Sequence, residues 1–491
     1  MNLKDESTHK EMPASIPKVQ TCIRGLDEIL FGGLPAERTT IISGEAGSGK
    51  TVLAMEFIYR KALAGDPGIF LSFEESAGDL IANVAGMGMN IQSLENSGKL
   101  RVVHAEIPEN TIHSGEFDTR GLLAMIEGHA GLIGARYVVI DAVDVLMWLF
   151  KDPEREREEI YSILSRLRKM GMTTIMTVKA DPSGSKIYPF LDFMADCVLK
   201  LDQLMLNRVR TRRLSVMKYR GSGFLANEHP YVFSEEGLVF LPLSSMSLEQ
   251  FPFVDRVSSG LASLDERLGG GYYKGSSVLL AGPTGSGKTS LACVFAHAAC
   301  SRGEKVLYLD FEVAAEVLVS AVRSIGLDIK PAMEGETRLN IMTALPETLE
   351  VEQHLLWVIN ELERFKPDHL VIDPISAARR MGSEKDAFDF AVRLMLLCKV
   401  RNITSIFLNQ TTSEEHLTEI SGIGVSSLVD AIIALEYFYE EQGMSRRLAI
   451  IKSRGSAHST DYCRMQITDT GIRLCEMRNK EDEKSTGNRR P

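Results

Sequence analysis

Two short glycine-rich segments carry the same phosphate-binding pattern. Residues 44–51 read GEAGSGKT and residues 282–289 read GPTGSGKT, so their lysines stand 238 positions apart (288 − 50). Both fit G-x-x-x-x-G-K-[ST], in which backbone N–H groups surround a β-phosphate, the lysine reaches the β- and γ-phosphates, and the hydroxyl binds Mg²⁺. The predicted ATP-binding residues are Gly44, Gly47, Ser48, Gly49, Lys50 and Thr51 in the first segment, and Gly282, Thr284, Gly285, Ser286, Gly287, Lys288 and Thr289 in the second.

Two aspartates are candidates for helping to hold Mg²⁺. Asp141 ends the apolar run VVID and Asp373 ends LVID, 91 and 85 positions after their lysines (141 − 50; 373 − 288). A carboxylate at the end of a strand beside a phosphate loop is the usual metal-assisting group of this kind of site. We therefore predict metal binding by each aspartate together with Thr51 or Thr289. A strand-end cap or turn is the alternative role for either aspartate.

Three glutamates are candidates for catalysis. Glu74 and Glu312 each follow their lysine by 24 positions (74 − 50; 312 − 288), at the end of the next strand. Ligands of open α/β sheets bind at that end, where a carboxylate can polarise a water or a hydroxyl aimed at the γ-phosphate. Glu75 adds a second acid in the first half, where the second half has Val313. The alternative for each glutamate is a solvated loop acid.

A pair of cations closes each half of the chain. Lys218 and Arg220 stand in MKYRGS, and Lys452 and Arg454 stand in IKSRGS. Alternate residues of a strand face the same way, so each pair projects two positive charges together. Because the pairs are distant in sequence from the phosphate loops, we predict that they reach the γ-phosphate of a neighbouring subunit. The alternative is the charged face of an edge strand.

These chemical groups recur because the chain is an internal duplication. In each half a β-rich run (TTIISG or SVLLAG) precedes the glycine-rich loop, and a segment with helical spacing follows it. Further apolar strands follow, among them GIFLSFEE and KVLYLDFE. Alternating strands and helices with apolar strands indicate a mostly parallel sheet flanked by helices. The predicted fold class is α/β, with two tandem P-loop NTPase domains.

The boundary between the halves is predicted where periodic patterning stops, near residues 241–257. This gives an N-terminal domain over 17–245 and a C-terminal domain over 246–476. Residues 1–16 and 477–491 are polar and charged, and we expect both to be disordered tails.

Composition limits the function classes open to this chain. The 491 residues carry a net charge of −11, which disfavours binding to nucleic acid in spite of the basic run RVRTRR. We find neither a membrane-spanning run nor the apolar core of a signal peptide, so we expect a cytoplasmic protein that does not enter a membrane. The seven cysteines never form CxxC and are odd in number, which favours reduced thiols.

Taken in order, these motifs resemble the KaiC family of circadian clock ATPases and autokinases. The residues that carry the resemblance are the two RecA-like halves, FEES after the first phosphate loop and K-x-R-G-S at the end of each half, from about residue 17 to 475. The resemblance implies a double-ring homohexamer with ATP and Mg²⁺ between subunits, and regulatory or signalling protein partners. It also implies ATP hydrolysis in the N-terminal ring and phosphate transfer to the chain's own hydroxyls in the C-terminal ring.

The same resemblance implies where the phosphate would be accepted. Residues 420–438 match the family's acceptor region and place Ser426 and Ser427 at the acceptor positions, with Ser421 as a weaker candidate. The local offset between the halves, 234, puts Asp192 and Phe193 at the equivalent positions of the first half. The hydroxyl pair is thus confined to the half in which the family has its kinase activity. Plain loop or cap serines are the alternative.

The leading hypothesis is an ATPase and serine autokinase. Glu74, with Glu75, would orient the attacking water, and Glu312 would accept the proton of Ser426 or Ser427. A nucleic-acid-dependent ATPase of the RecA or DnaB type is one alternative, since LNQ at 408–410 resembles a segment of RecA-type recombinases. A scaffold assembled by nucleotide but without kinase activity is the other.

Overall fold

The computed structural model describes residues 16–105, 119–150, 152–180, 188–206, 209–242, 252–334, 337–411, 424–440 and 443–477. Nearly all of both predicted tails, and Ser421, lie outside these residues. The chain divides into two compact units, Met1–Met205 with Arg210–Ser245, and Leu206–Val209 with Met246–Pro491. The two are described below as the first unit and the second unit.

The first unit is built on one nine-stranded sheet within the described residues, in the order β11-β10-β9-β8-β3-β7-β6-β4-β5. From β8 to β5 the pairings are all parallel. The strands are β3 (Thr39–Gly44), β4 (Gly68–Ser72), β5 (Leu100–His104), β6 (Tyr137–Asp141), β7 (Thr173–Lys179), β8 (Cys197–Leu206), β9 (Val209–Tyr219), β10 (His229–Ser234) and β11 (Gly237–Phe240).

The second unit repeats this topology strand for strand, in the order β16-β15-β17-β18-β14-β19-β20-β21-β22. Its strands are β14 (Ser277–Gly282), β15 (Val306–Asp310), β16 (Leu339–Thr343), β17 (His369–Asp373), β18 (Thr404–Gln410), β19 (Ala431–Glu440), β20 (Gly443–Ser453), β21 (Cys463–Thr468) and β22 (Gly471–Glu476). A two-stranded sheet accompanies each unit: β1 (Lys18–Val19) with β2 (Leu34–Pro35), and β12 (Arg256–Val257) with β13 (Tyr272–Tyr273).

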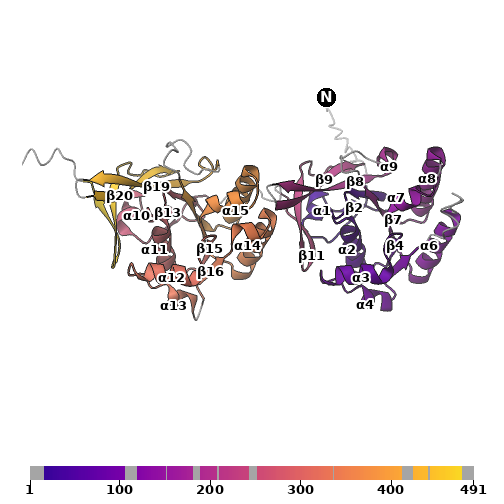
Figure 1. Ribbon diagram of the computed structural model, residues 1–491, viewed down its shortest axis with the longest axis horizontal. Helices are drawn as coiled ribbons and strands as arrows, with labels where there is room; N and C mark the ends of the chain where they lie inside the picture. Colours follow the sequence, from indigo (N-terminus) through magenta and orange to yellow (C-terminus); the bar gives the residue numbers. More distant parts are fainter. Residues whose placement is uncertain are drawn as a thin grey trace, which may run out of the picture. The chain divides into compact units, whose positions relative to one another are not determined.

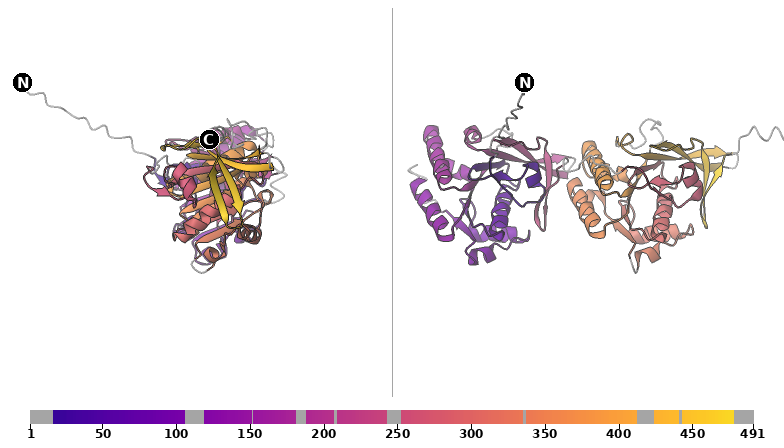
Figure 2. Two further views of the ribbon diagram at one scale, coloured as in Figure 1. Left: turned by 90° about the vertical axis from the view of Figure 1, so that its left-hand side faces the viewer. Right: turned by 180° about the vertical axis from the view of Figure 1, so that it is seen from behind.

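Helices lie on both faces of each sheet (Figures 1 and 2). The first unit has α1 (Leu26–Ile29), α2 (Lys50–Leu63), α3 (Ala77–Ala85), α4 (Ile91–Asn96), α6 (Thr119–Ile133), α7 (Val143–Met147), α8 (Pro153–Lys169) and α9 (Pro189–Met194). The second has α10 (Ala262–Arg267), α11 (Lys288–Ser301), α12 (Ala315–Arg323), α13 (Lys330–Met333), α14 (Val351–Phe365) and α15 (Glu384–Val400), with the 3-10 helices η2 (Pro346–Thr348) and η3 (Ile375–Arg380). No helix among the described residues is both long enough and apolar enough to cross a membrane.

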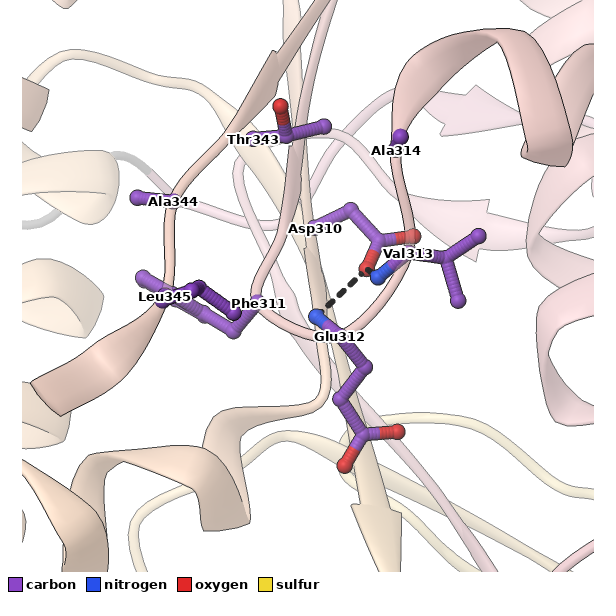
Figure 3. Close-up of a pocket in the computed structure, with 8 residues that line it drawn as sticks. All are labelled: Asp310, Phe311, Glu312, Val313, Ala314, Thr343, Ala344 and Leu345. Atoms are coloured by element: carbon purple, nitrogen blue, oxygen red, sulfur yellow. Dashed lines mark hydrogen bonds between the residues drawn. The ribbon is translucent and has the colours of Figure 1, made fainter.

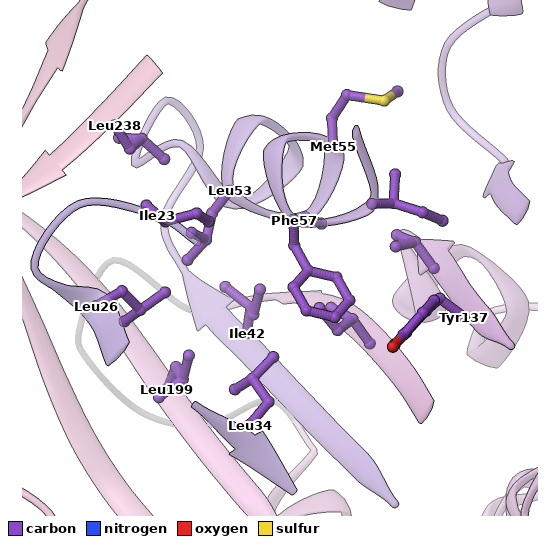
Figure 4. Close-up of a cluster of buried hydrophobic side chains, with 14 of the residues drawn as sticks. Ile23, Leu26, Leu34, Ile42, Leu53, Met55, Phe57, Tyr137, Leu199 and Leu238 are labelled. Atoms are coloured by element: carbon purple, nitrogen blue, oxygen red, sulfur yellow. The ribbon is translucent and has the colours of Figure 1, made fainter. Parts of the chain in front are cut away.

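Strand periodicity explains why both faces are covered. Neighbouring residues of β3 point to opposite faces of the sheet, so Ile42 joins the core beneath α2 whereas Ile41 joins the core beneath α6 and α8. Figure 4 shows the first of these cores, in which Phe57 of α2 packs near Ile42 and Tyr137. Each such buried side chain contributes about 1.5–3 kcal/mol to folding. The predicted fold class, a mostly parallel sheet flanked by helices in each half, is confirmed.

One buried acid ties α2 to the last hairpin of the first unit. Glu56 is 1% exposed; one carboxylate oxygen accepts the Leu238 N–H at 2.7 Å, and the other accepts Arg60 Nε at 2.7 Å. Burial raises the pKa of Glu56, and the two donors oppose that rise. A Cβ on Gly237 would lie 2.4 Å from this carboxylate, so the hairpin requires glycine there. The second unit has Val294 in place of Glu56 (56 + 238).

Replacing Glu56 by Ala should therefore loosen the β10–β11 hairpin. The buried N–H of Leu238 would lose its partner, which costs about 1–3 kcal/mol. Amide hydrogen exchange of β11 measures this as a lower opening free energy. Glu158→Ala, at an exposed site on α8, is the control and should change it by less than about 0.5 kcal/mol. Equal protection of β11 in Glu56→Ala and the wild type would contradict the assignment.

Candidate nucleotide sites

Each phosphate loop connects a central strand to a helix that begins at the predicted lysine. Lys50 opens α2 and Lys288 opens α11. The preceding glycines, Gly49 and Gly287, have φ of 93° and 101°, a left-handed conformation that favours glycine. A Cβ would lie 2.7 Å from the ring of Phe233 in the first loop and 2.7 Å from Met465 Cε in the second. The loop can therefore curl tightly enough to surround a phosphate only with glycine at this position.

The two lysines fold back over their own loops. Lys50 Nζ donates to Glu45 O at 2.9 Å, and Lys288 Nζ donates to the carbonyls of Gly282 at 2.7 Å and Pro283 at 2.9 Å. Burial lowers the pKa of both ammonium groups, while the nearby carboxylates of the same site act to raise it. Each ammonium is thus held where a phosphate oxygen could replace the carbonyl as its acceptor.

The predicted metal-binding pairs are in contact in both units. Thr51 Oγ1 donates to Asp141 Oδ2 at 3.0 Å, and Thr289 Oγ1 donates to Asp373 Oδ2 at 2.7 Å. Burial raises the pKa of both aspartates, and the hydroxyl donors oppose it. Hydroxyl and carboxylate oxygens are the ligands that Mg²⁺ prefers in proteins. The residues present therefore fit a magnesium ion at each loop.

The two aspartates differ in their second partner. Thr177, on the neighbouring strand β7, donates to Asp141, whereas Asp373 accepts the hydroxyl of Tyr308 at 2.8 Å. The first unit has Phe70 at the position of Tyr308 (308 − 238), so only the second of the two sites has a hydroxyl at this position. Sequence reasoning missed Tyr308, although a comparison of the two halves would have revealed it.

The structure separates the two glutamates of the first site. Glu74 is exposed, and its carboxylate acts electrostatically on Lys50. Glu75 Oε2 instead accepts Asn83 Nδ2 of α3 at 2.8 Å, and its backbone N–H donates to Ser72 Oγ at 3.1 Å. The prediction named both acids as catalytic; the structure leaves Glu74 exposed, where its charge acts on Lys50, and ties the Glu75 carboxylate to the helix that follows.

Glu312 projects from the turn after β15, beside a pocket of about 210 Å³ (Figure 3). Its side chain is 47% exposed, and its carboxylate lies 3.8 Å from Arg380 of η3. Arg380 also approaches Glu347 at 3.4 Å. The charge of Glu312 acts to raise the pKa of Lys288, as that of Glu74 does for Lys50. Each site thus combines a lysine, a hydroxyl–aspartate pair and one accessible glutamate.

Asp310, which sequence reasoning did not single out, is also part of the second site. This residue is 3% exposed and lies opposite Asp373 in the pairing of β15 with β17. Burial raises the pKa of Asp310 to about 6, although the backbone N–H groups of Glu312 and Val313 favour its charged form. The first unit has Ser72 at the same position (310 − 238).

Each pair of cations binds backbone carbonyls of the segment just before the neighbouring strand: the end of α9 before β8 in the first unit, and the residues before β19 in the second. Arg220 Nη2 donates to Phe193 O at 2.7 Å, and Lys218 Nζ donates to the carbonyls of Asp192 and Ala195. In the second unit the acceptors are the carbonyls of the two candidate serines. Lys452 Nζ lies 3.1 Å from Ser426 O and 3.3 Å from Ser427 O, and Arg454 Nη2 lies 2.5 Å from Ser427 O.

The loop that carries Ser426 and Ser427 lies, with its two cations, at the amino ends of the parallel strands. The phosphate loop of the same unit lies at the carboxyl ends of those strands. β19 runs parallel to β14 and begins beside it, with Ala431 opposite Val278. Asp430 joins the two strand beginnings, because its N–H donates to Ser277 O at 2.8 Å. The phosphate loop follows the other end of β14, and a strand of six residues spans about 17 Å. Ser426 and Ser427 are therefore about one strand length from their own nucleotide site.

Comparisons with known proteins agree with this duplicated architecture. The family model described as "ATPase: KaiC" matches residues 19–245 and again residues 257–479. Circadian clock protein KaiC2 of Synechocystis sp. is 35% identical over 488 residues, which cover 98% of this chain and 86% of that protein. The circadian clock oscillator protein KaiC of Parathermosynechococcus lividus is 34% identical, over 94% of this chain and 85% of that protein.

The separation of Glu74 from Glu75 predicts unequal effects of two matched substitutions. With the second site silenced by Lys288→Ala, Glu74→Gln should slow ATP hydrolysis at least about 100-fold, the usual contribution of a positioned acid–base group. Glu75→Gln should change the same rate less than about threefold, since its carboxylate faces α3. Steady-state ADP release measures both. Equal losses in the two variants would show that Glu75 acts on the phosphate.

Proposed function

The chain belongs to the KaiC family of ATPases, and from that premise we propose a division of labour between its two units. The first unit hydrolyses ATP. The second unit transfers the γ-phosphoryl group of ATP to Ser426 and Ser427 of another copy of the same chain. This autophosphorylation serves signalling. Both activities take place in a homohexameric double ring that binds ATP and Mg²⁺ between subunits.

One observation carries the kinase proposal: the hydroxyl pair and the cation pair form one cluster. Lys452 and Arg454 hold the backbone carbonyls of Ser426 and Ser427. A γ-phosphate attracted by these two cations would arrive beside the serine hydroxyls, with Ser427 exposed. Cations that clamp a transferring phosphoryl group are a recurring part of such sites.

The position of this cluster supports transfer between subunits. Its loop lies at the amino edge of the sheet, about one strand length from the phosphate loop at the carboxyl edge. Reacting atoms must approach to about 3–3.5 Å for transfer. A ring in which the Ser426–Ser427 loop of one subunit faces the phosphate loop of the next subunit would allow this close approach.

The chemistry follows from the groups at the two edges. The Oγ atom of Ser427 or Ser426 forms the new bond to the γ-phosphorus, while the bond from that phosphorus to the bridging oxygen breaks and ADP leaves. Glu312 of the ATP-bound subunit accepts the serine proton. Lys288 of that subunit and the incoming Lys452 and Arg454 balance the charge on the phosphoryl oxygens. Thr289 and Asp373 would hold a Mg²⁺ ion, which when bound would neutralise further charge on the phosphates.

The first unit has the same phosphate-loop motif, but it lacks the serines in the segment that would face the phosphate loop of the neighbouring subunit. Asp192 and Phe193 stand at the positions of the two serines, and the Phe193 side chain is 76% exposed. An apolar ring and a carboxylate offer no hydroxyl to phosphorylate. Water oriented by Glu74 is then the acceptor, which supports hydrolysis as the reaction of this unit.

Incubation with γ-labelled ATP followed by peptide mapping tests the kinase proposal. Label should appear within residues 420–438, and Ser426→Ala with Ser427→Ala should abolish it. Glu312→Gln should slow its appearance at least about 100-fold, because the serine proton loses its acceptor. An assembled protein that hydrolyses ATP without labelling this segment would contradict the proposal and leave hydrolysis as the chemistry of both units.

A further inference from the structure

The turn that carries the glutamate is held differently in the two units. In the first unit, Ser76 caps α3 by accepting the Asp79 N–H, and Asn83 of that helix holds the carboxylate of Glu75. Ser72, which ends β4, accepts the Glu75 N–H at 3.1 Å, so the turn is held both from the strand before it and from the helix after it. The second unit has Ala314 and Ala321 at the positions of Ser76 and Asn83 (each + 238), so it has neither side-chain group.

Asp310 stands at the position of Ser72 (310 − 238) and holds this turn from the strand before it. Its Oδ1 accepts the N–H of Glu312 at 2.9 Å and the N–H of Val313 at 2.7 Å. Figure 3 shows this carboxylate inside the turn, with the Glu312 side chain directed away from it. Hydrogen bonds from backbone N–H groups to a carboxylate are stronger than those between neutral groups, so two of them fix the turn firmly.

The surroundings of Asp310 leave its carboxylate little freedom to move. It is 3% exposed and ends β15, which lies between β16 and β17 with Thr343 and Asp373 as its partners in register. Since Glu312 is only two residues farther along, the direction of its backbone is set by the N–H bond to Asp310. The Glu312 carboxylate is otherwise half-exposed.

We infer that Asp310 is a positioning residue for Glu312, and that its two hydrogen bonds to the turn compensate for the contacts from Ser76 and Asn83 that the second unit lacks. The inference deepens the proposed function and rests on it, because Glu312 is the proposed proton acceptor. It also accounts for Val313 in place of a second acid: at this position the turn uses the backbone N–H, which Asp310 accepts, and needs no side-chain bond to the helix.

Three variants of the full-length protein test this role, all in a Glu74→Gln background that silences hydrolysis in the first unit. Asp310→Ala should slow phosphoryl transfer about tenfold or more, because small misplacements of a catalytic group cost that much. Asp310→Asn should stay within about threefold of the parent, because its amide oxygen can accept the same two N–H groups. Asp310→Ala added to Glu312→Gln should cause no further loss, since the two residues act as one unit.

Three results would overturn the inference: full activity in Asp310→Ala, equal losses in the Ala and Asn variants, or an additive double variant. The apparent KM for ATP should stay within about threefold throughout, because Lys288 and Thr289 are unchanged. If the parent carries no label on its serines, the proposed acceptor is wrong. ADP release from the second site then replaces the label as the readout, with the same three comparisons, because Glu312 would orient water in that case.

Discussion

Parallel pairing of the phosphate-loop strand with the strand beside it is the constraint on which the rest of each unit depends. Because β14 and β19 start at the same edge, the loop before β19 is placed opposite the loop after β14. A chain cannot bring its own serines to its own phosphate loop without breaking that pairing. The fold itself therefore keeps the two serines away from their own phosphate loop, and the proposed transfer requires the phosphate loop of another subunit.

The two units share this framework and differ at two places on it. One is the turn after β4 or β15, which is held through Ser72, Asn83 and Glu75 in the first unit and through Asp310 in the second. The other is the segment before β8 or β19, with Phe193 of α9 in the first unit and Ser427 in the second. In the proposed reaction the first place is on the ATP-bound subunit and the second is on the subunit that accepts the phosphoryl group. After the duplication, the phosphate-loop motif stayed the same in both units, whereas the turn after β4 or β15 and the segment before β8 or β19 diverged.

The sequence predicted the framework well and the side-chain partners less well. Spacing from the two lysines locates strand ends, so the sheets and the Thr51–Asp141 and Thr289–Asp373 contacts follow from it. It cannot tell which of two adjacent acids faces the phosphate, and Glu75 proved to face α3. The roles of Tyr308, Asp310 and Arg380 depend on which side chains meet across strands and turns, which a linear pattern does not encode.

Complementation between two inactive chains tests transfer between subunits most directly. Lys288→Ala chains keep their serines but cannot hold ATP in the second unit, whereas Ser426→Ala, Ser427→Ala chains hold ATP but cannot accept. Each alone should remain unlabelled by γ-labelled ATP. Mixed rings should become labelled, and only on the Lys288→Ala chains. Absence of label in mixed rings whose wild-type counterparts are labelled would contradict transfer between subunits and place donor and acceptor on one chain.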